Sequence, residues 1–201
     1  MREHYRRIPG WCDFEDFYAR MVAWAPDGSH FVEVGAYLGR SACYMASCIK
    51  RSGKQIRFDA VDIWLPYDPE KTPWMFSWLG DKEASLARQM VDAHGGLKEA
   101  FLAFMDEAGV AEYVNAVHAN SVTAASLYAD RSLDFVYIDA NHKYEAVLAD
   151  LAAWVTKIRP GGVLGGHDYS PEWPGVEKAV HEVFGNAVGR VSVSSWMTRI
   201  S

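Results

Sequence analysis

The fold is decided by the stretch Val32-Glu33-Val34-Gly35-Ala36-Tyr37-Leu38-Gly39-Arg40-Ser41. Residues 30–34 form a short β-rich run that ends at Gly35, and residues 40–50 have the pattern of a helix. Gly35 and Gly39 let the backbone turn tightly and let a ligand approach it closely. Their Gly-x-x-x-Gly spacing differs from the Gly-x-Gly-x-x-Gly of dinucleotide-binding folds. The stretch therefore predicts a strand, a glycine turn and a helix, which together begin a βαβ unit.

The rest of the chain continues this alternation of strands and helices. It indicates right-handed βαβ crossovers and a mostly parallel sheet covered on both faces. The 201 residues suffice for one such domain with an insert, so we assign residues 1–201 to a single domain. We expect Asn141 to cap the helix over residues 142–158 and Pro160-Gly161-Gly162 to end it. Further strands are expected at residues 56–61, 113–118, 133–138, 163–166, 187–193 and 195–200, and further helices at residues 11–25 and 176–184.

The segment at residues 63–112 is longer than one crossover helix requires. Helical stretches are expected at residues 82–93 and 97–108, while the first part is rich in proline and aromatic residues. A long insertion at the carboxyl edge of a parallel sheet is usually a lid or a substrate cap. Its aromatic residues fit two interpretations, the core of the cap or a dimer contact, and a platform for an apolar or glycosyl substrate. They are Trp64, Tyr67, Trp74, Phe76 and Trp78.

Charge and composition argue against several classes of protein. The chain has 20 basic and 26 acidic residues, a net charge of −6 and no run of more than two basic residues, which disfavours binding to duplex nucleic acid. No apolar run approaches the roughly 20 residues that span a bilayer, and the N-terminus lacks the apolar core of a signal peptide. Cys12, Cys43 and Cys48 make no disulfide framework. We therefore expect a cytoplasmic protein that binds neither nucleic acid nor a membrane.

Polar residues follow the second and third predicted strands, at the edge where doubly wound sheets bind ligands. Asp62 ends the second strand, where a carboxylate can accept two hydrogen bonds from ribose hydroxyls. Asn120 and Ser121 follow the third strand and could face an adenine edge. The alternative for Asp62 is a surface cap, and the alternative for Asn120 and Ser121 is a helix N-cap.

Several short motifs, taken in their order and spacing, resemble the class I S-adenosylmethionine-dependent methyltransferases. The resemblance covers residues 10–200 without the insertion. It is closer to the small-molecule O-methyltransferase branch, which includes sugar, macrolide, catechol-type and cephalosporin-hydroxylase-like proteins. Besides the glycine loop, the motifs are Val61-Asp62-Ile63-Trp64, Asp139-x-x-His142-x-Tyr144, Pro160-Gly161-Gly162, Gly165-Gly166-His167-Asp168-Tyr169, and Gly175-Val176-Glu177-Lys178-Ala179-Val180 with the late Trp196.

The resemblance implies a Rossmann-like α/β fold and a reaction. The doubly wound sheet would have seven strands in the order 3-2-1-4-5-7-6, the last strand antiparallel, with helices on both faces and a cap insertion after the second strand. The protein would transfer a methyl group from S-adenosylmethionine to a hydroxyl of a small molecule, such as a sugar or a glycosylated metabolite. The resemblance implies that Glu33, Gly35 and Gly39 line the methionine part of this cofactor, that Asp62 holds the ribose, and that Asn120 and Ser121 lie near the adenine. The further residues implied to bind it are Tyr37, Ser41, Ile63 and Asp139.

A second site is expected where the fourth and fifth strands end, at Asp139, His167 and Asp168. Related metal-dependent methyltransferases bind a divalent cation with carboxylates and an amide at these positions. Such a cation, Mg²⁺ or Mn²⁺, could hold two substrate oxygens and lower the pKa of the attacking hydroxyl. His167 stands where an acidic residue is common, and one imidazole with carboxylates also suits iron or zinc.

Alternatives to the metal and to the enzyme class stay open at this point. The candidate catalytic residues are Asp139, His142 and His167. Either histidine could be a general base, since imidazole titrates near neutral pH, while His142 could instead be a helix-start residue bonded to Asp139. Alternative functions are an NAD-dependent oxidoreductase, against which the missing Gly-x-Gly-x-x-Gly counts, and a non-catalytic cofactor-binding protein of the same fold. A homo-oligomer is also compatible with the sequence.

Overall fold

The chain folds around one seven-stranded sheet. The computed structural model describes residues 4–68 and 70–201, and within them the strand order is β3-β2-β1-β4-β5-β7-β6. The strands are β1 (His30–Val34), β2 (Arg57–Asp62), β3 (Asn115–His118), β4 (Leu133–Ile138), β5 (Ile158–Gly166), β6 (Gly189–Arg190) and β7 (Trp196–Arg199). The α-helices are α1 (Glu15–Trp24), α2 (Arg40–Ser52), α3 (Asp81–His94), α4 (Leu97–Glu107), α5 (Ser121–Ala125), α6 (Tyr144–Val155) and α7 (Pro174–Phe184). Short 3-10 turns are η1 (His4–Arg7), η2 (Pro73–Phe76), η3 (Ala111–Tyr113) and η4 (Gly185–Ala187).

The central strands run parallel, and the last strand runs against its neighbours. β1 pairs in parallel with β2 and β4, and β5 pairs in parallel with β4. β7 is antiparallel to both β5 and β6. Every residue of β4 is buried, as expected for a parallel strand with helices over both faces. The predicted sheet order and the antiparallel last strand are therefore confirmed.

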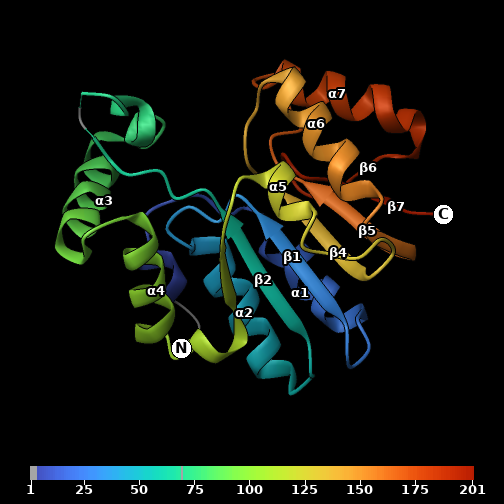
Figure 1. The fold of residues 1–201 in the computed structure, drawn as a ribbon, viewed down its shortest axis with the longest axis horizontal. Helices are drawn as coiled ribbons and strands as arrows, with labels where there is room; N and C mark the ends of the chain where they lie inside the picture. The colour runs from blue at the N-terminus through green and yellow to red at the C-terminus, as the bar shows by residue number, and fades with distance from the viewer. Residues whose placement is uncertain (1–3, 69) are drawn as a thin grey trace.

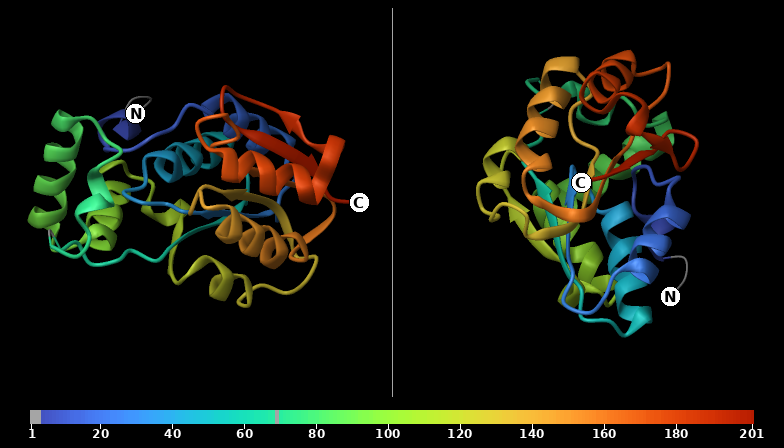
Figure 2. Two further views of the ribbon diagram at one scale, coloured as in Figure 1. Left: turned by 90° about the horizontal axis from the view of Figure 1, so that it is seen from above. Right: turned by 90° about the vertical axis from the view of Figure 1, so that its right-hand side faces the viewer.

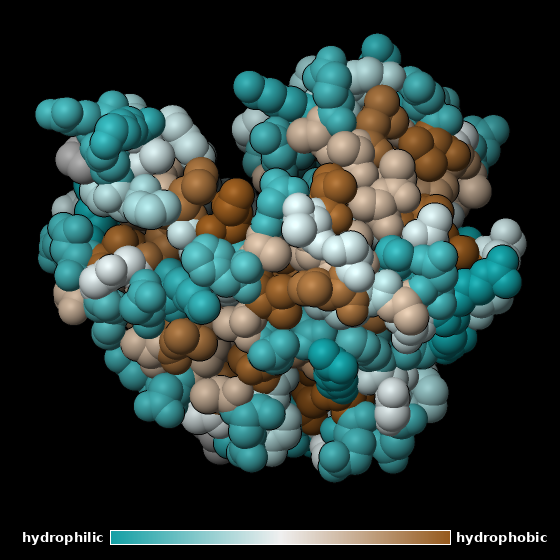
Figure 3. All heavy atoms as spheres, viewed as in Figure 1, coloured by the Kyte–Doolittle hydropathy of each residue, from teal (hydrophilic) through white to brown (hydrophobic). Residues whose placement is uncertain are grey.

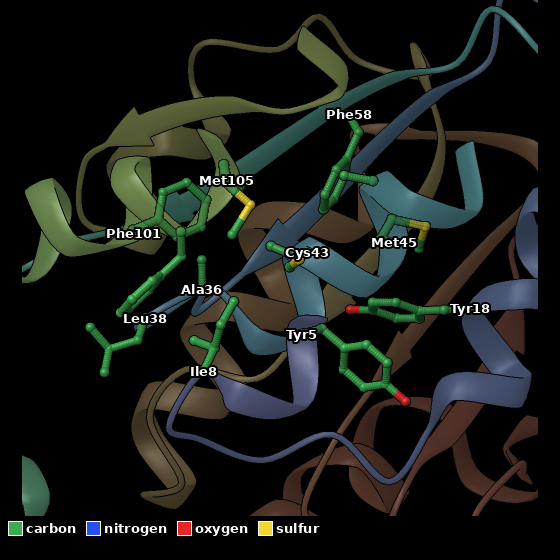
Figure 4. Close-up of a cluster of buried hydrophobic side chains, with 14 of the residues drawn as sticks. Tyr5, Ile8, Tyr18, Ala36, Leu38, Cys43, Met45, Phe58, Phe101 and Met105 are labelled. Atoms are coloured by element: carbon green, nitrogen blue, oxygen red, sulfur yellow. The ribbon is translucent and has the colours of Figure 1, made fainter. Parts of the chain in front are cut away.

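Helices cover both faces of the sheet. Figures 1 and 2 show α1 and α2 on one side and α5 and α6 on the other. The buried side chains accordingly form one core on each face. The first core contains Tyr18, Cys43 and Phe58, which Figure 4 labels among their neighbours. The second core contains Val136 and Trp154.

Side chains alternate along β1, and this alternation decides where Glu33 lies. Phe31 belongs to the core on the α1 and α2 face, whereas Val32 and Val34 belong to the core on the other face. Glu33 has the same parity as Phe31 and is 1% exposed. The strand therefore places a carboxylic acid inside the first, largely apolar layer.

The structure corrects the boundaries predicted around β5. This strand begins at Ile158, inside the region predicted as a helix over residues 142–158, and α6 spans only Tyr144–Val155. Ile158 pairs with Leu133, and the register shifts immediately afterwards. Pro160 and the two glycines after it lie in this irregular part of the strand, where a missing backbone donor is tolerated. The prediction that they end a helix was wrong.

Other predicted boundaries move by a few residues. The helix expected at residues 11–25 begins only at Glu15, because Asp13 bonds to a side chain at the end of β5. The last two strands are shorter than predicted. Asn141 does not cap α6 directly: its side-chain oxygen accepts the backbone N–H of Lys143 at 2.9 Å, one residue before the helix begins.

The insertion after β2 contains η2, α3, α4 and η3. Figure 1 shows α3 on the side of the molecule away from α6 and α7. Trp64 and Phe76 are buried, and Tyr67 packs on Phe76 with ring centroids 4.8 Å apart, so the core interpretation holds for these three. Trp74 and Trp78 are instead about half exposed. Among the described helices, none combines the length and the apolarity that crossing a membrane demands.

Candidate active site

A cavity of about 1260 Å³ opens at the carboxyl edge of the sheet. Figure 3 shows the molecule hollowed between the lobe that carries α3 and the lobe that carries α6 and α7. The wall combines the ends of β1, β2, β4 and β5 with the segment before α1, the insertion and the loop before α7. A pocket for one drug-sized ligand measures about 300–1,000 Å³. This cavity is therefore large enough for a cofactor and an acceptor side by side.

Backbone hydrogen bonds align the strand ends that carry the site. The N–H of Gly35 donates to the carbonyl of Val61 at 2.8 Å, and the N–H of Asp139 donates to the carbonyl of Val34 at 2.7 Å. A third bond of this kind joins the N–H of His167 to the end of β4 at 3.0 Å. The sheet ladder thus continues past the strands, which brings the residues after β1, β4 and β5 to one edge.

Two glycines shape the turn after β1. Gly35 has φ +98°, and a Cβ at this position would lie 1.9 Å from the carbonyl oxygen of Asp139. Gly39 has φ +91°, and its Cβ would lie 2.6 Å from the ring of Phe101 and 2.7 Å from Met105. Both glycines are therefore required by the packing of the protein itself. Gly35 lies on the cavity wall, whereas Gly39 is not among the lining residues.

Asp62 ends β2 with its carboxylate bonded to the glycine loop. The N–H of Tyr37 donates to Oδ2 and the N–H of Trp64 donates to Oδ1, each at 2.7 Å. Burial raises the pKa of this carboxyl above its usual value, and the backbone N–H groups oppose that rise. A carboxylate offers about four acceptor positions, so Asp62 keeps capacity for a ligand. It lines the cavity together with Tyr37 and Ile63.

Glu33 lies beneath the cavity and not on its wall. The hydroxyl of Ser41, which is on the wall, donates to Oε1 of Glu33, while Oε2 has no partner among the described residues. Burial raises the pKa of Glu33 to about 8, although the hydrogen bond from Ser41 works to lower it. A buried carboxyl oxygen without a partner is costly, and a cationic group nearby would lower that cost.

The loop after β3 contributes Asn120 and Ser121 to the wall. Asn120 is the N-cap of α5, and its side-chain oxygen accepts the N–H of Val122 at 3.1 Å. The hydroxyl of Ser121 accepts the indole N–H of Trp154 at 3.0 Å. The capping interpretation therefore holds for Asn120, and both residues also face the cavity.

Asp139, His142 and Asp168 form a cluster whose possible ligand atoms all lie within 4.8 Å of one another. Nε2 of His142 is 2.8 Å from Oδ2 of Asp168 and 4.0 Å from Oδ1 of Asp139. Asp168 has φ +58°, a left-handed conformation that costs a non-glycine residue about 1–3 kcal/mol. Strain of this kind in a carboxylate that lines a cavity points to a functional position.

His167 lies beside this cluster, and both of its ring nitrogens face protein oxygens. Nε2 is 3.0 Å from Oδ1 of Asp13 and 2.9 Å from the hydroxyl of Ser194, while Nδ1 is 3.3 Å from Asp168 and 3.7 Å from Asp139. The structure thus places both histidines beside the two carboxylates. The group with ligand atoms within 4.8 Å of one another contains His142, which the sequence had named as a catalytic candidate. Sequence reasoning missed Asp13 and Ser194, which lie 154 and 27 residues away along the chain and belong to no local motif.

The two histidines are held in their protonated forms by the surrounding carboxylates. Burial works to lower the pKa of His142, but the neighbouring carboxylates of Asp139 and Asp168 raise it to about 9. Burial likewise opposes protonation of His167, but the charge of Asp139 and the bonds to Asp13 and Asp168 raise its pKa to about 11. A general base must be neutral at the working pH. These values therefore disfavour the alternative in which either histidine is the base without a metal.

The family of the chain follows from its sequence. Residues 32–169, more than half of the chain, match the family described as a methyltransferase domain, and the chain belongs to this family. It is therefore a methyltransferase of the S-adenosylmethionine-dependent class, which confirms the resemblance in the motifs. The family match gives no support to the alternative that the chain is an NAD-dependent oxidoreductase. No curated protein matches the sequence significantly.

Solved structures share the whole fold at low sequence identity. The cofactor-bound protein Rv0187 from MTB is 17% identical, with a TM-score of 0.61 over 96% of this chain and 82% of that one. The O-methyltransferase NovP is 16% identical, with a TM-score of 0.61 over 94% and 80%. CalS11, a TDP-rhamnose 3'-O-methyltransferase of calicheamicin biosynthesis, is 17% identical, with a TM-score of 0.56 over 92% and 76%. At these identities the similarity establishes the fold alone.

Proposed function

We propose that this chain methylates a hydroxyl group of a small molecule. The observation that carries the proposal is that one cavity joins the glycine loop and Asp62 to the cluster of Asp139, His142 and Asp168. The first half offers acceptors for a ribose, and the second offers groups that can activate an acceptor hydroxyl. Two similar structures, NovP and CalS11, are O-methyltransferases by name, which supports an oxygen acceptor.

The residues on the wall fit S-adenosylmethionine. Asp62 would hold the ribose hydroxyls, and Asn120 and Ser121 would lie against the adenine. Ser41, with Glu33 behind it, would face the methionine ammonium, for which the unpartnered Oε2 of Glu33 provides compensating charge. When bound, S-adenosylmethionine supplies an electrophilic methyl group on sulfur. The protein's own task is then to align the acceptor and to assist removal of its proton.

The cluster fits a divalent cation by the chemistry of its donors. Two carboxylates, Asp139 and Asp168, and one imidazole, His142, suit Mn²⁺, iron or zinc, and Mg²⁺ is compatible with the carboxylates. A cation in this position would lower the pKa of the acceptor hydroxyl. His167, through its bonds to Asp13 and Ser194, would hold Asp139 and Asp168 in place. We thus assign His142 as the imidazole ligand and His167 as a positioning residue.

The cofactor assignment is tested by replacing Asp62 with alanine. A hydrogen bond to a charged group is worth about 1.5–3 kcal/mol, so Asp62→Ala should weaken S-adenosylhomocysteine binding by about tenfold or more. Calorimetric titration measures this affinity. Asp62→Asn is the milder variant, because its amide oxygen can still accept one of the two backbone N–H bonds that Tyr37 and Trp64 donate to Asp62. Unchanged affinity in a folded Asp62→Ala protein would remove the assignment.

The metal assignment predicts that Mn²⁺ binds to chelator-treated protein and restores its activity. Asp168→Asn and His142→Ala should each weaken Mn²⁺ binding by about 10–100-fold, as the loss of a metal-site residue typically does. Calorimetry with Mn²⁺ measures binding without an acceptor. Full activity in excess chelator would refute the assignment and revive the general-base alternative for His142.

The location, the partners and the oligomeric state of the protein are also part of this proposal. Cys12, Cys43 and Cys48 are all unpaired, which supports a reducing, cytoplasmic location. The acid excess of the chain supports a small-molecule partner over a nucleic acid. A homo-oligomer stays a prediction, and the mass of the protein in solution tests it.

A further inference from the structure

Asp150 is a buried carboxyl group on the cavity wall to which the proposed function gives no role. It belongs to α6, and the residue is 4% exposed. An aspartate this deeply buried is normally paired with a cation, but none of the ion pairs within residues 4–68 and 70–201 includes Asp150. The wall of the site thus contains an acidic group without a positive partner in the described part of the chain.

The hydroxyl of Ser121 connects Asp150 to the loop after β3. It accepts the indole N–H of Trp154 at 3.0 Å and donates its own proton to the carboxyl of Asp150. Burial raises the pKa of Asp150, and the hydrogen bond from Ser121 opposes that rise. A carboxylate has about four acceptor positions, and Ser121 occupies one of them. Asp150 therefore keeps acceptor capacity for a donor group of a ligand.

The cavity wall around Asp150 suits a flat ring. Ala146 and Ala149 of the same helix line the cavity, and their side chains end at Cβ. Ile63 after β2 and Val122 in α5 line it as well, with exposed fractions of 43% and 45%. A planar base in this part of the cavity would cover apolar side chains, which is favourable. Its polar edge would then meet the carboxyl of Asp150.

The positions of the reacting groups decide which part of the cofactor reaches Asp150. In the proposed function the ribose lies at Asp62, and the methyl group meets the metal cluster that follows β4 and β5. The sulfur and the base are attached to opposite ends of the ribose, so the base extends away from the cluster. The N–H of Ala119 donates to the carbonyl of Asp62 at 3.0 Å, which places the loop after β3 directly beside the ribose position. That loop leads to Ser121, the hydrogen-bond partner of Asp150.

We propose that Asp150 recognises the 6-amino group of the adenine in S-adenosylmethionine. This assignment rests on the proposed function and adds to it a specificity-determining residue that no sequence motif had indicated. The amino group of adenine is a hydrogen-bond donor, and an aspartate or glutamate can accept from such a group. Guanine and hypoxanthine have an oxygen at the same place, which a carboxylate would repel. Asp150 therefore selects the adenine form of the cofactor.

Two ligands that differ only in this amino group test the assignment. Calorimetry on the full chain compares S-adenosylhomocysteine with its 6-deamino analogue, in which a hydrogen replaces the amino group. The analogue should bind the wild type about tenfold or more weakly, because it fills the site and leaves the buried acceptor without a donor. Equal affinities for the two ligands would overturn the inference.

Variants of α6 assign this preference to a residue. Asp150→Ala should bind the two ligands within about threefold of each other. Asp150→Asn keeps the shape of the side chain but replaces one acceptor oxygen by an N–H donor group, so the preference should fall by about threefold or more. Glu145→Ala, at an exposed position of the same helix, is the control and should keep the wild-type preference. A wild-type preference in both Asp150 variants overturns the inference.

The melting temperatures of the same proteins separate recognition from packing. If Asp150 only supports the contact between α5 and α6, Asp150→Ala lowers the Tm and weakens both ligands by the same factor, and this outcome also overturns the inference. Failure of S-adenosylhomocysteine to bind the wild type refutes the proposed function and the role of Asp150 with it. Binding of both ligands with equal affinity refutes the role of Asp150 alone.

Discussion

At the scale of single residues, Glu33 shows how strand parity can place a charge-bearing group in a core. Its neighbours Val32 and Val34 face one layer of helices, and Glu33 faces the other, where Ser41 is its hydrogen-bond donor. The layer is apolar, so burial favours the neutral acid and raises its pKa to about 8. A ligand ammonium above Ser41 would reverse that preference, since an opposite charge stabilises the carboxylate.

This buried acid predicts a pH dependence of stability. Between its ordinary pKa and about 8, the folded chain keeps a proton on Glu33 that the unfolded chain has released. The stability that this residue contributes is therefore full at low pH and is lost as the pH rises through this window, with a slope of at most about 1.4 kcal/mol per pH unit. The glutamine in Glu33→Gln cannot titrate. The unfolding free energy of this variant should therefore rise relative to that of the wild type as the pH increases from about 5 to about 8.

Denaturant unfolding of both proteins at several pH values measures the difference. The comparison cancels the histidines and the other carboxyl groups, because they are common to the two chains. Parallel curves for the wild type and Glu33→Gln would show that Glu33 does not titrate in this range, and the pKa derived from its burial would then be wrong.

At the scale of the element, η2 places one aromatic ring in the core of the insertion and another on the cavity wall within a few residues. Phe76 is 1% exposed and packs on Tyr67, while Trp74, two residues earlier, is 56% exposed on the cavity wall. Both side chains are large aromatic rings in a segment rich in proline. Their roles differ because the tight turn directs one ring into the core of the insertion and the other toward the cavity.

Truncation of the two rings should change the stability of the protein by very different amounts. Phe76→Ala removes a buried ring and should cost about 3–5 kcal/mol of unfolding free energy. Trp74→Ala should stay within about 0.5 kcal/mol of the wild type, as surface substitutions do. Denaturant unfolding measures both variants, and calorimetry with S-adenosylhomocysteine should show their cofactor affinities within a few-fold of each other. A large loss of stability in Trp74→Ala would mean that the ring is part of the core of the cap.

At the scale of the whole molecule, the segment before α1 ties the two walls of the cavity together. The N–H of Gly10 donates to Glu83 of α3 at 3.0 Å, and Asp13 bonds to His167 at the end of β5. Ser194, from the turn between β6 and β7, joins the same bond network. Segments from both ends of the chain therefore close the site whose floor is made by β1, β2, β4 and β5.

A ligand that fills this site should stabilise the whole fold. S-adenosylhomocysteine at 100 times its Kd should add about 2.7 kcal/mol, which for a chain of this size raises the Tm by roughly 5–10 °C. NAD at the same concentration should leave the Tm unchanged. A thermal-shift titration with both compounds decides between the methyltransferase site and the oxidoreductase alternative, and a shift with NAD alone would contradict the assignment made here.

The sequence by itself determined the order of the elements and the residues at the strand ends. Periodicity and glycine turns mark β1, β2, β4 and α2 because these features depend on neighbours along the chain. The same local signals indicated Asp62, which ends β2, Asp139, which directly follows β4, and Asp168, which comes one residue after the end of β5. The resemblance in the motifs supplied the strand order, which local pattern alone cannot.

The tertiary structure decided which of these residues meet and in what state. The pairing of His167 with Asp13 and Ser194 depends on strand packing that joins opposite ends of the chain. The irregular start of β5 overrides the local tendency of Pro160 to break structure, because Ile158 gains a strand partner. Exposure of Trp74 and burial of Phe76 likewise follow from how the insertion packs. Contacts between distant segments carry no local signal, so burial, pKa and ligand geometry emerged only once the chain was folded.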